Sequence, residues 1–223
     1  MAPPPLHDAQ LLIFDLDGTL VDSLDDLVTA VNLTRADAGL APLPREAVVP
    51  LVGFGSLYLV QRCLAPAGEM LEGQALETAH ARYLQHYNAH LLDRTHLHDG
   101  ALAMLERYRT RCLAVVTNKL EAESRRILAG LGVLERFAVI VGGDTLAEKK
   151  PDPLPLRHVM KIAGAAPAET VMIGDGVNDV LAGKAAGVHT VAVTFGVDAA
   201  DALRALEPGY MIDHMRDLQN LIG

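Results

Sequence analysis

Two aspartates separated by a single leucine stand near the start of the chain, in the run DLDGT at 15–19. They follow LLIF at 11–14, a short apolar run that predicts a buried strand. Side chains two apart on a strand point to the same side, so Asp15 and Asp17 could flank one space. Two carboxylates that close repel each other unless a cation or a shared proton intervenes. The pair therefore indicates a metal site or acid–base chemistry, and an Asp-rich turn is the alternative for this motif taken alone.

Three further polar clusters each follow an apolar run. Thr117 and Asn118 come after LAVV, and their hydroxyl and amide groups can donate to an anion. Lys150 precedes a proline, which favours an extended backbone at the lysine and gives its side chain a defined direction. Asp175 and Asp179 lie in GDGVND, after VMI, and add two carboxylates of the kind that bind hard cations. Each cluster alone has an ordinary explanation as a helix cap, a solvated charge or a turn.

The four clusters are positioned by a regular alternation of predicted strands and helices. From residue 99 onward, short β-branched apolar runs alternate with helical patterns, which is typical of βαβ units and a parallel sheet. The carboxyl ends of parallel strands meet at one edge, where ligands bind, so we expect the four clusters to form one site. The predicted strands are 11–16, 112–117, 137–141, 170–173 and 190–194, and the predicted helices are 101–110, 120–131, 153–163, 178–186 and 199–206.

Residues 22–96 differ from the rest of the chain, because they show helical periodicity and no strand pattern. Leu24, Leu27 and Val31 recur at helical spacing behind Ser23, which we expect to cap this helix. Further helices are predicted at 44–51, 56–65 and 70–91. We therefore predict an α/β fold with a doubly wound parallel-sheet (Rossmann-like) core, formed by 1–21 and 97–223, and an all-helical cap domain inserted at 22–96 after the first strand.

The composition argues against several partners and locations. A net charge of −9 without any Lys/Arg cluster argues against nucleic acid as the main partner, and the apolar runs are too short to span a membrane. Cys63 and Cys112 have no partner motif, which is typical of buried thiols in a reducing cytoplasm. Residues 1–10 lack the pattern of a signal peptide and predict a short irregular arm. We expect a cytoplasmic protein, with monomer and homodimer both open.

The order of the four clusters matches a known set of motifs: DxDGT, a strand ending in Thr-Asn, Lys-Pro, and GDxxxD. In this order the chain resembles the haloacid-dehalogenase-like hydrolase superfamily from Leu11 to its end, including a helical cap after the first motif. The resemblance implies that Asp15 attacks phosphorus and forms an aspartyl-phosphate, while Asp17 acts as acid and base. Members with an aspartate two residues after the nucleophile transfer phosphoryl groups, so the resemblance favours a phosphatase or mutase over a dehalogenase.

The same resemblance implies a Mg²⁺ cofactor. The implied ligands are the Asp15 carboxylate, the main-chain carbonyl of Asp17, and Asp175. Asp179 either binds the metal directly or supports the residues that do. His96 and His98 have a spacing that could chelate a metal, but they precede Asp-Gly at the end of the cap and indicate a hinge instead.

Specificity is expected to depend mainly on the cap. By resemblance, Thr117 and Lys150 bind the transferring phosphoryl oxygens, and Asn118 is a local donor. In the cap, VGFGS at 52–56 resembles a segment of the phosphoglycolate phosphatase family. The candidate substrate contacts there are Gly53, Phe54, Gly55, Ser56 and Arg62. A turn between helices explains the two glycines equally well, and Arg62 has a simple alternative as a solvated residue.

We therefore expect a magnesium-dependent phosphatase that hydrolyses a small phosphorylated metabolite, with 2-phosphoglycolate as the leading substrate. The alternatives within this fold are a phosphatase for another small ester such as a sugar phosphate or for pyrophosphate, and a phosphomutase. A non-enzymatic binding module would lack one or more of the catalytic groups, and none is missing here.

Overall fold

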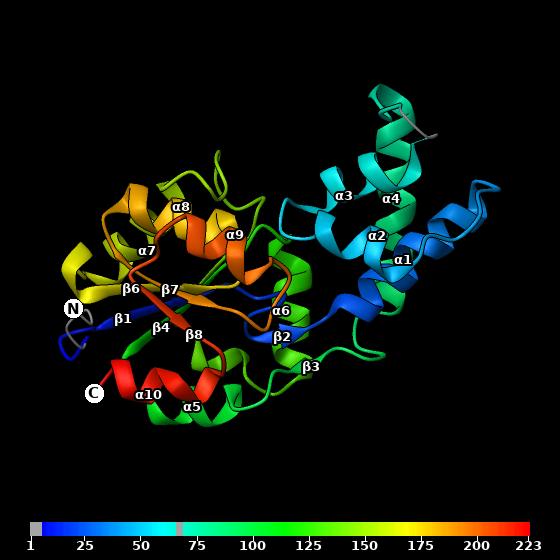
Figure 1. The fold of residues 1–223 in the computed structure, drawn as a ribbon. Helices are drawn as coiled ribbons and strands as arrows, with labels where there is room; N and C mark the ends of the chain where they lie inside the picture. The colour runs from blue at the N-terminus through cyan, green and yellow to red at the C-terminus, as the bar shows by residue number, and fades with distance from the viewer. Residues whose placement is uncertain (1–5, 66–68) are drawn as a thin grey trace.

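A six-stranded parallel sheet forms the centre of the structure, a computed structural model that describes residues 6–65 and 69–223. The strand order is β5-β4-β1-β6-β7-β8, so β1 lies in the interior between β4 and β6 (Figure 1). The strands are β1 (Leu11–Phe14), β4 (Cys112–Val116), β5 (Val139–Val141), β6 (Thr170–Gly174), β7 (His189–Val193) and β8 (Tyr210–Ile212).

Helices cover both faces of this sheet (Figure 1). Leu12 and Phe14 pack in one buried cluster and Leu11 and Ile13 in another, so both faces of β1 are buried and all four of its residues are apolar. One face carries α5 (Ala101–Arg107), α6 (Glu121–Gly130) and α10 (Leu218–Leu221). The other carries α7 (Leu154–Ala163), α8 (Val177–Ala186) and α9 (Ala200–Ala205). Single 3-10 turns lie at Leu134–Arg136, Pro167–Glu169 and Met215–Asp217. The α/β, Rossmann-like prediction is confirmed.

The chain turns directly after β1, earlier than the sequence pattern indicates. We expected a strand over 11–16, but β1 ends at Phe14. The main-chain nitrogen of Asp15 still donates to the Ile173 carbonyl at 2.9 Å, which extends the contact with β6 by one residue. The chain then wraps around the Leu16 carbonyl, which accepts main-chain hydrogen bonds from three residues that follow it. Asp15 and Asp17 therefore do not lie on one strand face.

Several short elements escape the sequence pattern. β8 is an edge strand of three residues, too short to show a reliable alternation, and α10 is a single turn. Two further strands, β2 (Val21–Asp22) and β3 (His96–Leu97), pair antiparallel. The prediction that 22–96 contains no strand is therefore wrong at both ends of that segment, where each strand has only two residues.

Between β2 and β3 the chain forms a helical insertion, the helices of residues 24–89. Its elements are α1 (Leu24–Asp37), α2 (Arg45–Val48) with a 3-10 turn at Val49–Leu51, α3 (Ser56–Leu64) and α4 (Gly73–Ala89). These helices stand beside the end of the sheet rather than on either face (Figure 1). The described part of the predicted arm at 1–10 begins at Leu6, and the remainder lies outside the described residues. None of the described helices has both the length and the hydrophobicity needed to cross a membrane.

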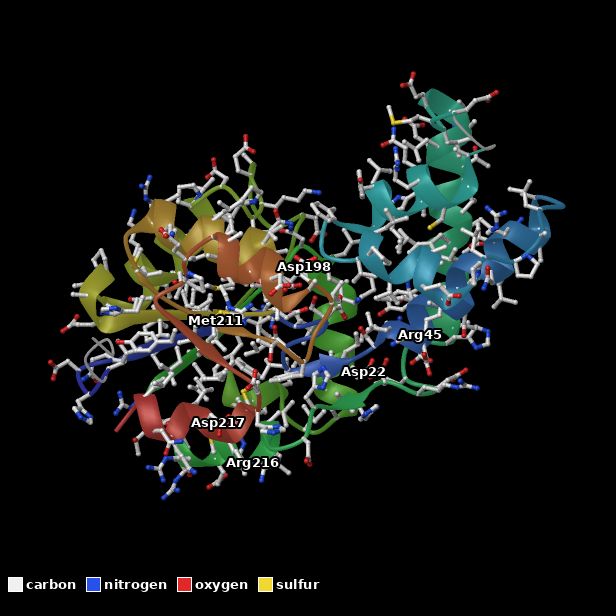
Figure 2. All side chains as sticks on the ribbon, viewed as in Figure 1. Asp22, Arg45, Asp198, Met211, Arg216 and Asp217 are labelled. Atoms are coloured by element: carbon white, nitrogen blue, oxygen red, sulfur yellow. The ribbon has the colours of Figure 1, made fainter. Side chains whose placement is uncertain are left out.

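The two connections between sheet and insertion are tied together by Asp26. Its carboxylate accepts hydrogen bonds from the main-chain nitrogens of Arg94 and Thr95 and from the Thr95 hydroxyl, at 2.7 to 3.1 Å. Asp22 lies at this junction, while Arg45 lies on the insertion (Figure 2). The outgoing and returning segments are therefore held side by side, which positions the insertion over the carboxyl ends of the strands.

Candidate active site

Three buried carboxylates meet at the carboxyl edge of the sheet. Asp15 follows β1, Asp175 follows β6, and Asp179 lies in the first turn of α8. Each offers an oxygen within 4.8 Å of the others. We call these three residues and Lys150 the acidic pocket. The expectation that separate strand ends would form one site describes this part of the structure well.

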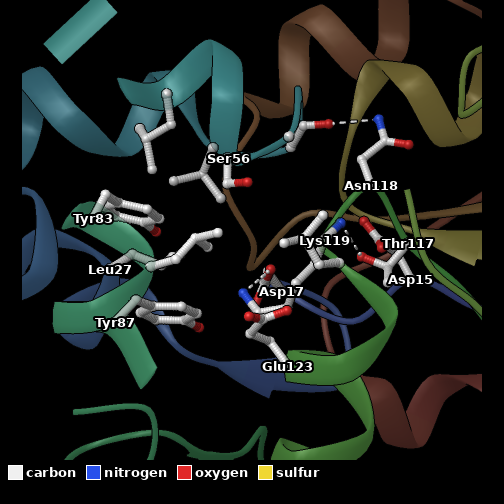
Figure 3. Close-up of a pocket in the computed structure, with 16 residues that line it drawn as sticks. Asp15, Asp17, Leu27, Ser56, Tyr83, Tyr87, Thr117, Asn118, Lys119 and Glu123 are labelled. Carbon is white, nitrogen blue, oxygen red and sulfur yellow. Dashed lines mark hydrogen bonds and ion pairs between the residues drawn. The ribbon is translucent and has the colours of Figure 1, made fainter. Parts of the chain in front are cut away.

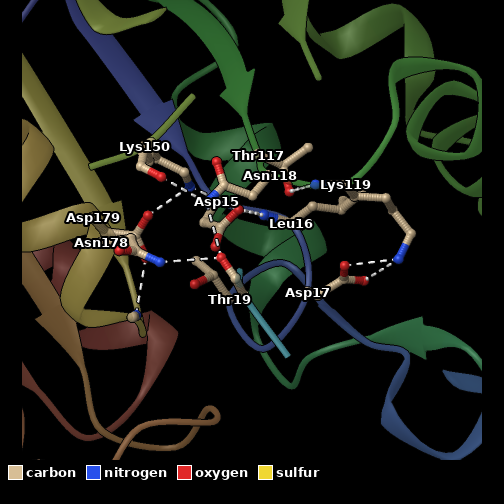
Figure 4. A network of polar contacts seen from close by, with 12 residues as sticks. Asp15, Leu16, Asp17, Thr19, Thr117, Asn118, Lys119, Lys150, Asn178 and Asp179 are labelled. Atoms are coloured by element: carbon tan, nitrogen blue, oxygen red, sulfur yellow. Dashed lines mark hydrogen bonds and ion pairs between the residues drawn. The ribbon is translucent and has the colours of Figure 1, made fainter. Parts of the chain in front are cut away.

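Lys150 provides the counter-charge of the acidic pocket (Figure 4). Its Nζ lies 2.9 Å from Asp15 Oδ1 and 2.5 Å from Asp179 Oδ1, and its side chain is 1% exposed. Burial disfavours the ammonium, but the two carboxylates outweigh burial and raise the pKa of Lys150 above its ordinary value. Lys150 therefore stays charged and holds Asp15 and Asp179 in fixed positions.

The other carboxylate oxygens are held by nearby donors. The Thr19 hydroxyl donates to Asp175 Oδ1 at 2.6 Å, and the main-chain nitrogen of Val197 donates to Asp175 Oδ2 at 2.7 Å. The main-chain nitrogen of Gly176 donates to Asp179 Oδ2 at 2.9 Å. These bonds orient the side chains toward one another, although their charges repel.

That repulsion is visible in the pKa values of two carboxyl groups. Burial, together with the charges of Asp15 and Asp179, raises the pKa of Asp175 well above its ordinary range. Burial and the Asp15 charge raise the pKa of Asp179 to about 7, although Lys150 opposes this rise. A lysine alone therefore does not balance the cluster, and a divalent cation among the three carboxylates would do so.

The acidic pocket fits Mg²⁺ by its chemistry, since buried carboxylate oxygens are the ligands that this ion prefers. The structure brings together three of the predicted ligands, Asp15, Asp175 and Asp179. The fourth, Asp17, was assigned through its main-chain carbonyl, and its side chain lies outside the cluster. Gly18 allows the main chain after Asp17 to pass close to the Asp175 carboxylate. Its φ is +83°, and a Cβ there would lie 2.2 Å from Asp175 Oδ2.

The carboxylate of Asp17 is bound by Lys119 instead (Figure 4). Lys119 Nζ donates to both Asp17 oxygens, at 2.7 and 3.0 Å, and also lies 4.6 Å from the centroid of the Tyr87 ring. The Ser23 hydroxyl donates to Asp17 Oδ1. Ser23 occupies the N-cap position of α1 as predicted, but its side chain makes no capping bond there. Lys119 was visible next to Thr-Asn in the sequence, but its role was not anticipated.

A cavity of about 40 Å³ separates this edge of the sheet from the insertion (Figure 3). We call it the insertion cavity. Its apolar wall comes mainly from α1, α3 and α4, and its polar wall from the ends of β1 and β4 and from α6. It is lined by Asp15, Asp17, Leu27, Val52, Gly53, Gly55, Ser56, Leu59, Tyr83, Leu84, Tyr87, Thr117, Asn118, Lys119, Leu120 and Glu123.

Most of the predicted substrate contacts lie at this cavity. The predicted residues that line it are Gly53, Gly55, Ser56, Thr117 and Asn118. Phe54 and Arg62 do not line it. Phe54 lines the hollow that contains the acidic pocket. Arg62 is exposed on α3 and is not among the residues that line either space.

Asn118 joins the insertion to the sheet through its amide nitrogen. Its Nδ2 donates to the Gly53 and Lys150 carbonyls, both at 2.8 Å. Asn178 Nδ2 donates to the same Gly53 carbonyl at 3.1 Å. The same loop accepts one more bond, from the Lys149 ammonium to the Phe54 carbonyl, at 2.8 Å. These contacts fix the loop before α3 over the acidic pocket.

Four buried polar atoms around the cavity have no hydrogen-bond partner among the residues that the structure describes. They are the hydroxyls of Tyr83 and Tyr87, Oδ1 of Asn118 and Oε2 of Glu123. The other Glu123 oxygen accepts from Asn88 Nδ2 at 3.0 Å. Buried polar groups of this kind are costly unless water or a ligand completes them. Sequence pattern provides no signal for the two tyrosines or for Glu123, because their spacing is that of ordinary helical residues.

Comparison with known proteins places this site in a family. A family model described as haloacid dehalogenase-like hydrolase matches residues 12–193. The phosphoglycolate phosphatase of Chromobacterium violaceum is 39% identical over 204 residues, covering 90% of this chain and 91% of the relative. That of Rhodospirillum rubrum is 44% identical over 191 residues, covering 83% and 79%.

Solved structures agree with these sequence matches. The crystal structure of a predicted phosphoglycolate phosphatase from Haemophilus somnus has a TM-score of 0.88 and 28% identity to this chain. It covers 96% of this chain, and the match spans 97% of that one. With the family model matching most of its length, this chain belongs to the haloacid dehalogenase-like hydrolase family.

Proposed function

We propose that the protein is a magnesium-dependent phosphatase that hydrolyses 2-phosphoglycolate through an aspartyl-phosphate. The family of the chain and its relatives named phosphoglycolate phosphatase make it a phosphoric monoester hydrolase. One observation carries the proposal: Asp15 and Asp17 line both the hollow that contains the acidic pocket and the insertion cavity. An ester can therefore place its phosphorus in the first space and its alcohol part in the second.

Asp15 is the proposed nucleophile. Leu16 N and Lys150 Nζ both contact its Oδ1, at 2.7 and 2.9 Å, which fixes the carboxylate and leaves Oδ2 to attack phosphorus. A bond forms between Oδ2 and phosphorus while the bond to the leaving oxygen breaks. Asp17 donates a proton to that oxygen. In the second half, Asp17 accepts a proton from a water molecule whose oxygen attacks phosphorus, and the bond to Asp15 breaks to release inorganic phosphate.

The remaining groups stabilise charge. Asp15, Asp175 and Asp179 would hold Mg²⁺ through carboxylate oxygens, with Asp17 contributing its carbonyl as predicted from the sequence. When bound, the ion neutralises charge on the phosphoryl oxygens. Lys150 adds a buried positive charge beside Asp15.

Substrate size is the basis for proposing a short ester. The insertion cavity is small, with apolar side chains facing it from the insertion, and suits an alcohol of few atoms. Relatives named phosphoglycolate phosphatase support 2-phosphoglycolate as that ester. We also propose that 22–96 acts as a cap domain on the 1–21 and 97–223 core, that the partner is a small phosphorylated metabolite, and that the protein is cytoplasmic.

A phosphate-release screen tests this function. Purified protein is assayed with Mg²⁺ against 2-phosphoglycolate, sugar phosphates and pyrophosphate. We expect 2-phosphoglycolate to give the highest kcat/KM, EDTA to abolish turnover, and added Mg²⁺ to restore it. Phosphate release that ignored EDTA would contradict the metal, a low rank for 2-phosphoglycolate would contradict the substrate, and no release from any ester would contradict the phosphatase.

A further inference from the structure

We propose that Lys119 selects the leaving group by binding a carboxylate one carbon away from the ester oxygen. This inference rests on the proposed function and adds the contact that would distinguish 2-phosphoglycolate from uncharged esters of the same size. It concerns the insertion cavity, around which four buried polar atoms have no partner among the described residues.

The position of Lys119 is the first argument. It follows β4, and its side chain is 7% exposed while its Nζ lies against the Asp17 carboxylate and the Tyr87 ring. Figure 3 shows it between the sheet edge and the two tyrosines of α4. Its ammonium therefore stands at the boundary between the reacting end of the site and the space for the alcohol.

The distribution of positive charge is the second argument. Among the described residues that line the insertion cavity, Lys119 is the only lysine or arginine. Lys150 is bound to Asp15 and Asp179, and the Lys149 ammonium donates to a main-chain carbonyl of the loop before α3. An anionic leaving group in this cavity therefore has one cation to meet.

Distance from the leaving oxygen is the third argument. A proton donor lies about 2.6–3.2 Å from the atom it protonates, so Asp17 must approach the leaving oxygen to that range. Lys119 Nζ lies within 3.0 Å of both Asp17 oxygens, so it stands within about 6 Å of the leaving oxygen, the sum of two hydrogen bonds. A carboxylate attached one carbon from that oxygen falls inside this span.

The walls of the cavity agree with such a group. With the insertion in this position, about 40 Å³ is free, room for on the order of three water-sized groups. Leu27, Val52 and Leu59 provide an apolar surface for a methylene. The hydroxyls of Tyr83 and Tyr87 are buried beside this space without a partner among the described residues.

Glu123 restricts where the anion can bind. Its carboxylate lines the same cavity, with one oxygen held by Asn88 and the other without a partner in the described chain. Because like charges repel, a substrate carboxylate is favoured beside Lys119 and disfavoured beside Glu123. The two residues together admit one short anionic group.

The test compares two substrates that differ only at this group. 2-Hydroxyethyl phosphate has the length of 2-phosphoglycolate but carries a hydroxymethyl group where the latter has a carboxylate. We expect the native protein to prefer 2-phosphoglycolate, and Lys119→Gln to lower the ratio of the two kcat/KM values by about 10- to 100-fold, the value of a charge-assisted hydrogen bond. Lys149→Gln, the matched control, should leave this ratio unchanged.

An equal loss for both substrates in Lys119→Gln would overturn the inference, because it would mean that Lys119 only holds Asp17. A native protein that hydrolyses both esters equally would overturn it too, while the phosphatase proposal would stand. Release of phosphate from neither ester would instead contradict the proposed function. If Lys119→Gln does not fold, inhibition of the native protein decides: glycolate should inhibit hydrolysis of 2-hydroxyethyl phosphate more strongly than ethylene glycol, and equal inhibition would refute carboxylate binding.

Discussion

The acidic pocket and the insertion cavity lie side by side, and Asp15 and Asp17 line both the hollow around the first and the second itself. The two regions differ in how their polar groups are satisfied. In the acidic pocket Lys150 and nearby donors bind each carboxylate. Around the insertion cavity, tyrosine hydroxyls and one oxygen of Glu123 are buried without a partner among the described residues. The chain itself therefore positions the groups of the acidic pocket, whereas the polar atoms around the insertion cavity are left for water or a ligand to complete.

Asp15→Asn is expected to have the largest effect, because Asp15 lines both spaces. The amide is a poor nucleophile, so kcat for 2-phosphoglycolate should fall by at least about 10³-fold. The fold should persist, since the change removes one charge from a cluster of repelling carboxylates. Phosphate release and urea unfolding measure the two effects. Turnover within tenfold of the native protein would exclude Asp15 as the nucleophile.

Lys150→Met tests the claim that the chain itself holds the carboxylates of the acidic pocket in place. It leaves Asp15 and Asp179 buried without their shared cation, and breaking such a contact costs about 3–5 kcal/mol of unfolding free energy. Lys149→Met is the matched control, since Lys149 is exposed and its ammonium donates one bond to a carbonyl. We expect the control to lose about 1 kcal/mol in urea unfolding. Equal losses would show that the pocket does not depend on Lys150.

Asn118→Ala tests the connection between the two regions. Its amide bridges the Gly53 and Lys150 carbonyls, so its loss should cost about 1–3 kcal/mol of stability and raise KM for 2-phosphoglycolate. Asn178→Ala removes a single, longer bond to Gly53 and should cost less. Urea unfolding and initial rates compare the two variants. A larger effect at Asn178 would contradict the bridging role.

The contrast between the regions also explains what the sequence could predict. Asp15, Thr117 and Asp175 directly follow apolar runs, and parallel strands bring their carboxyl ends to one edge whatever the other side chains are. Lys150 was readable from the proline that follows it. The acidic pocket was therefore readable as an order of motifs. The contact between Ser23 and Asp17 was not readable in this way, because it depends on the turn that the chain makes after β1.

The insertion cavity depends on how distant helices dock. Tyr83, Tyr87 and Glu123 come from α4 and α6, and nothing in their local spacing shows that they share a cavity. Arg62 illustrates the same limit in reverse. It lies on α3 with the cavity residue Leu59, but outside the buried stripe of that helix, so its side chain is exposed. Sequence pattern located the helix correctly, but it did not show which of its residues would reach the site.

Glu123→Gln is expected to have the smallest effect and gives the sharpest test of the cavity. Glutamine keeps an oxygen that can accept from Asn88, but it removes the negative charge beside the proposed carboxylate site. Weaker repulsion should raise kcat/KM for 2-phosphoglycolate about two- to fivefold and leave 2-hydroxyethyl phosphate nearly unchanged. A fall for both esters would show that Glu123 binds a donor on the alcohol. The insertion cavity would then recognise hydroxyl groups rather than a carboxylate, and its difference from the acidic pocket would lie in hydrogen bonding alone.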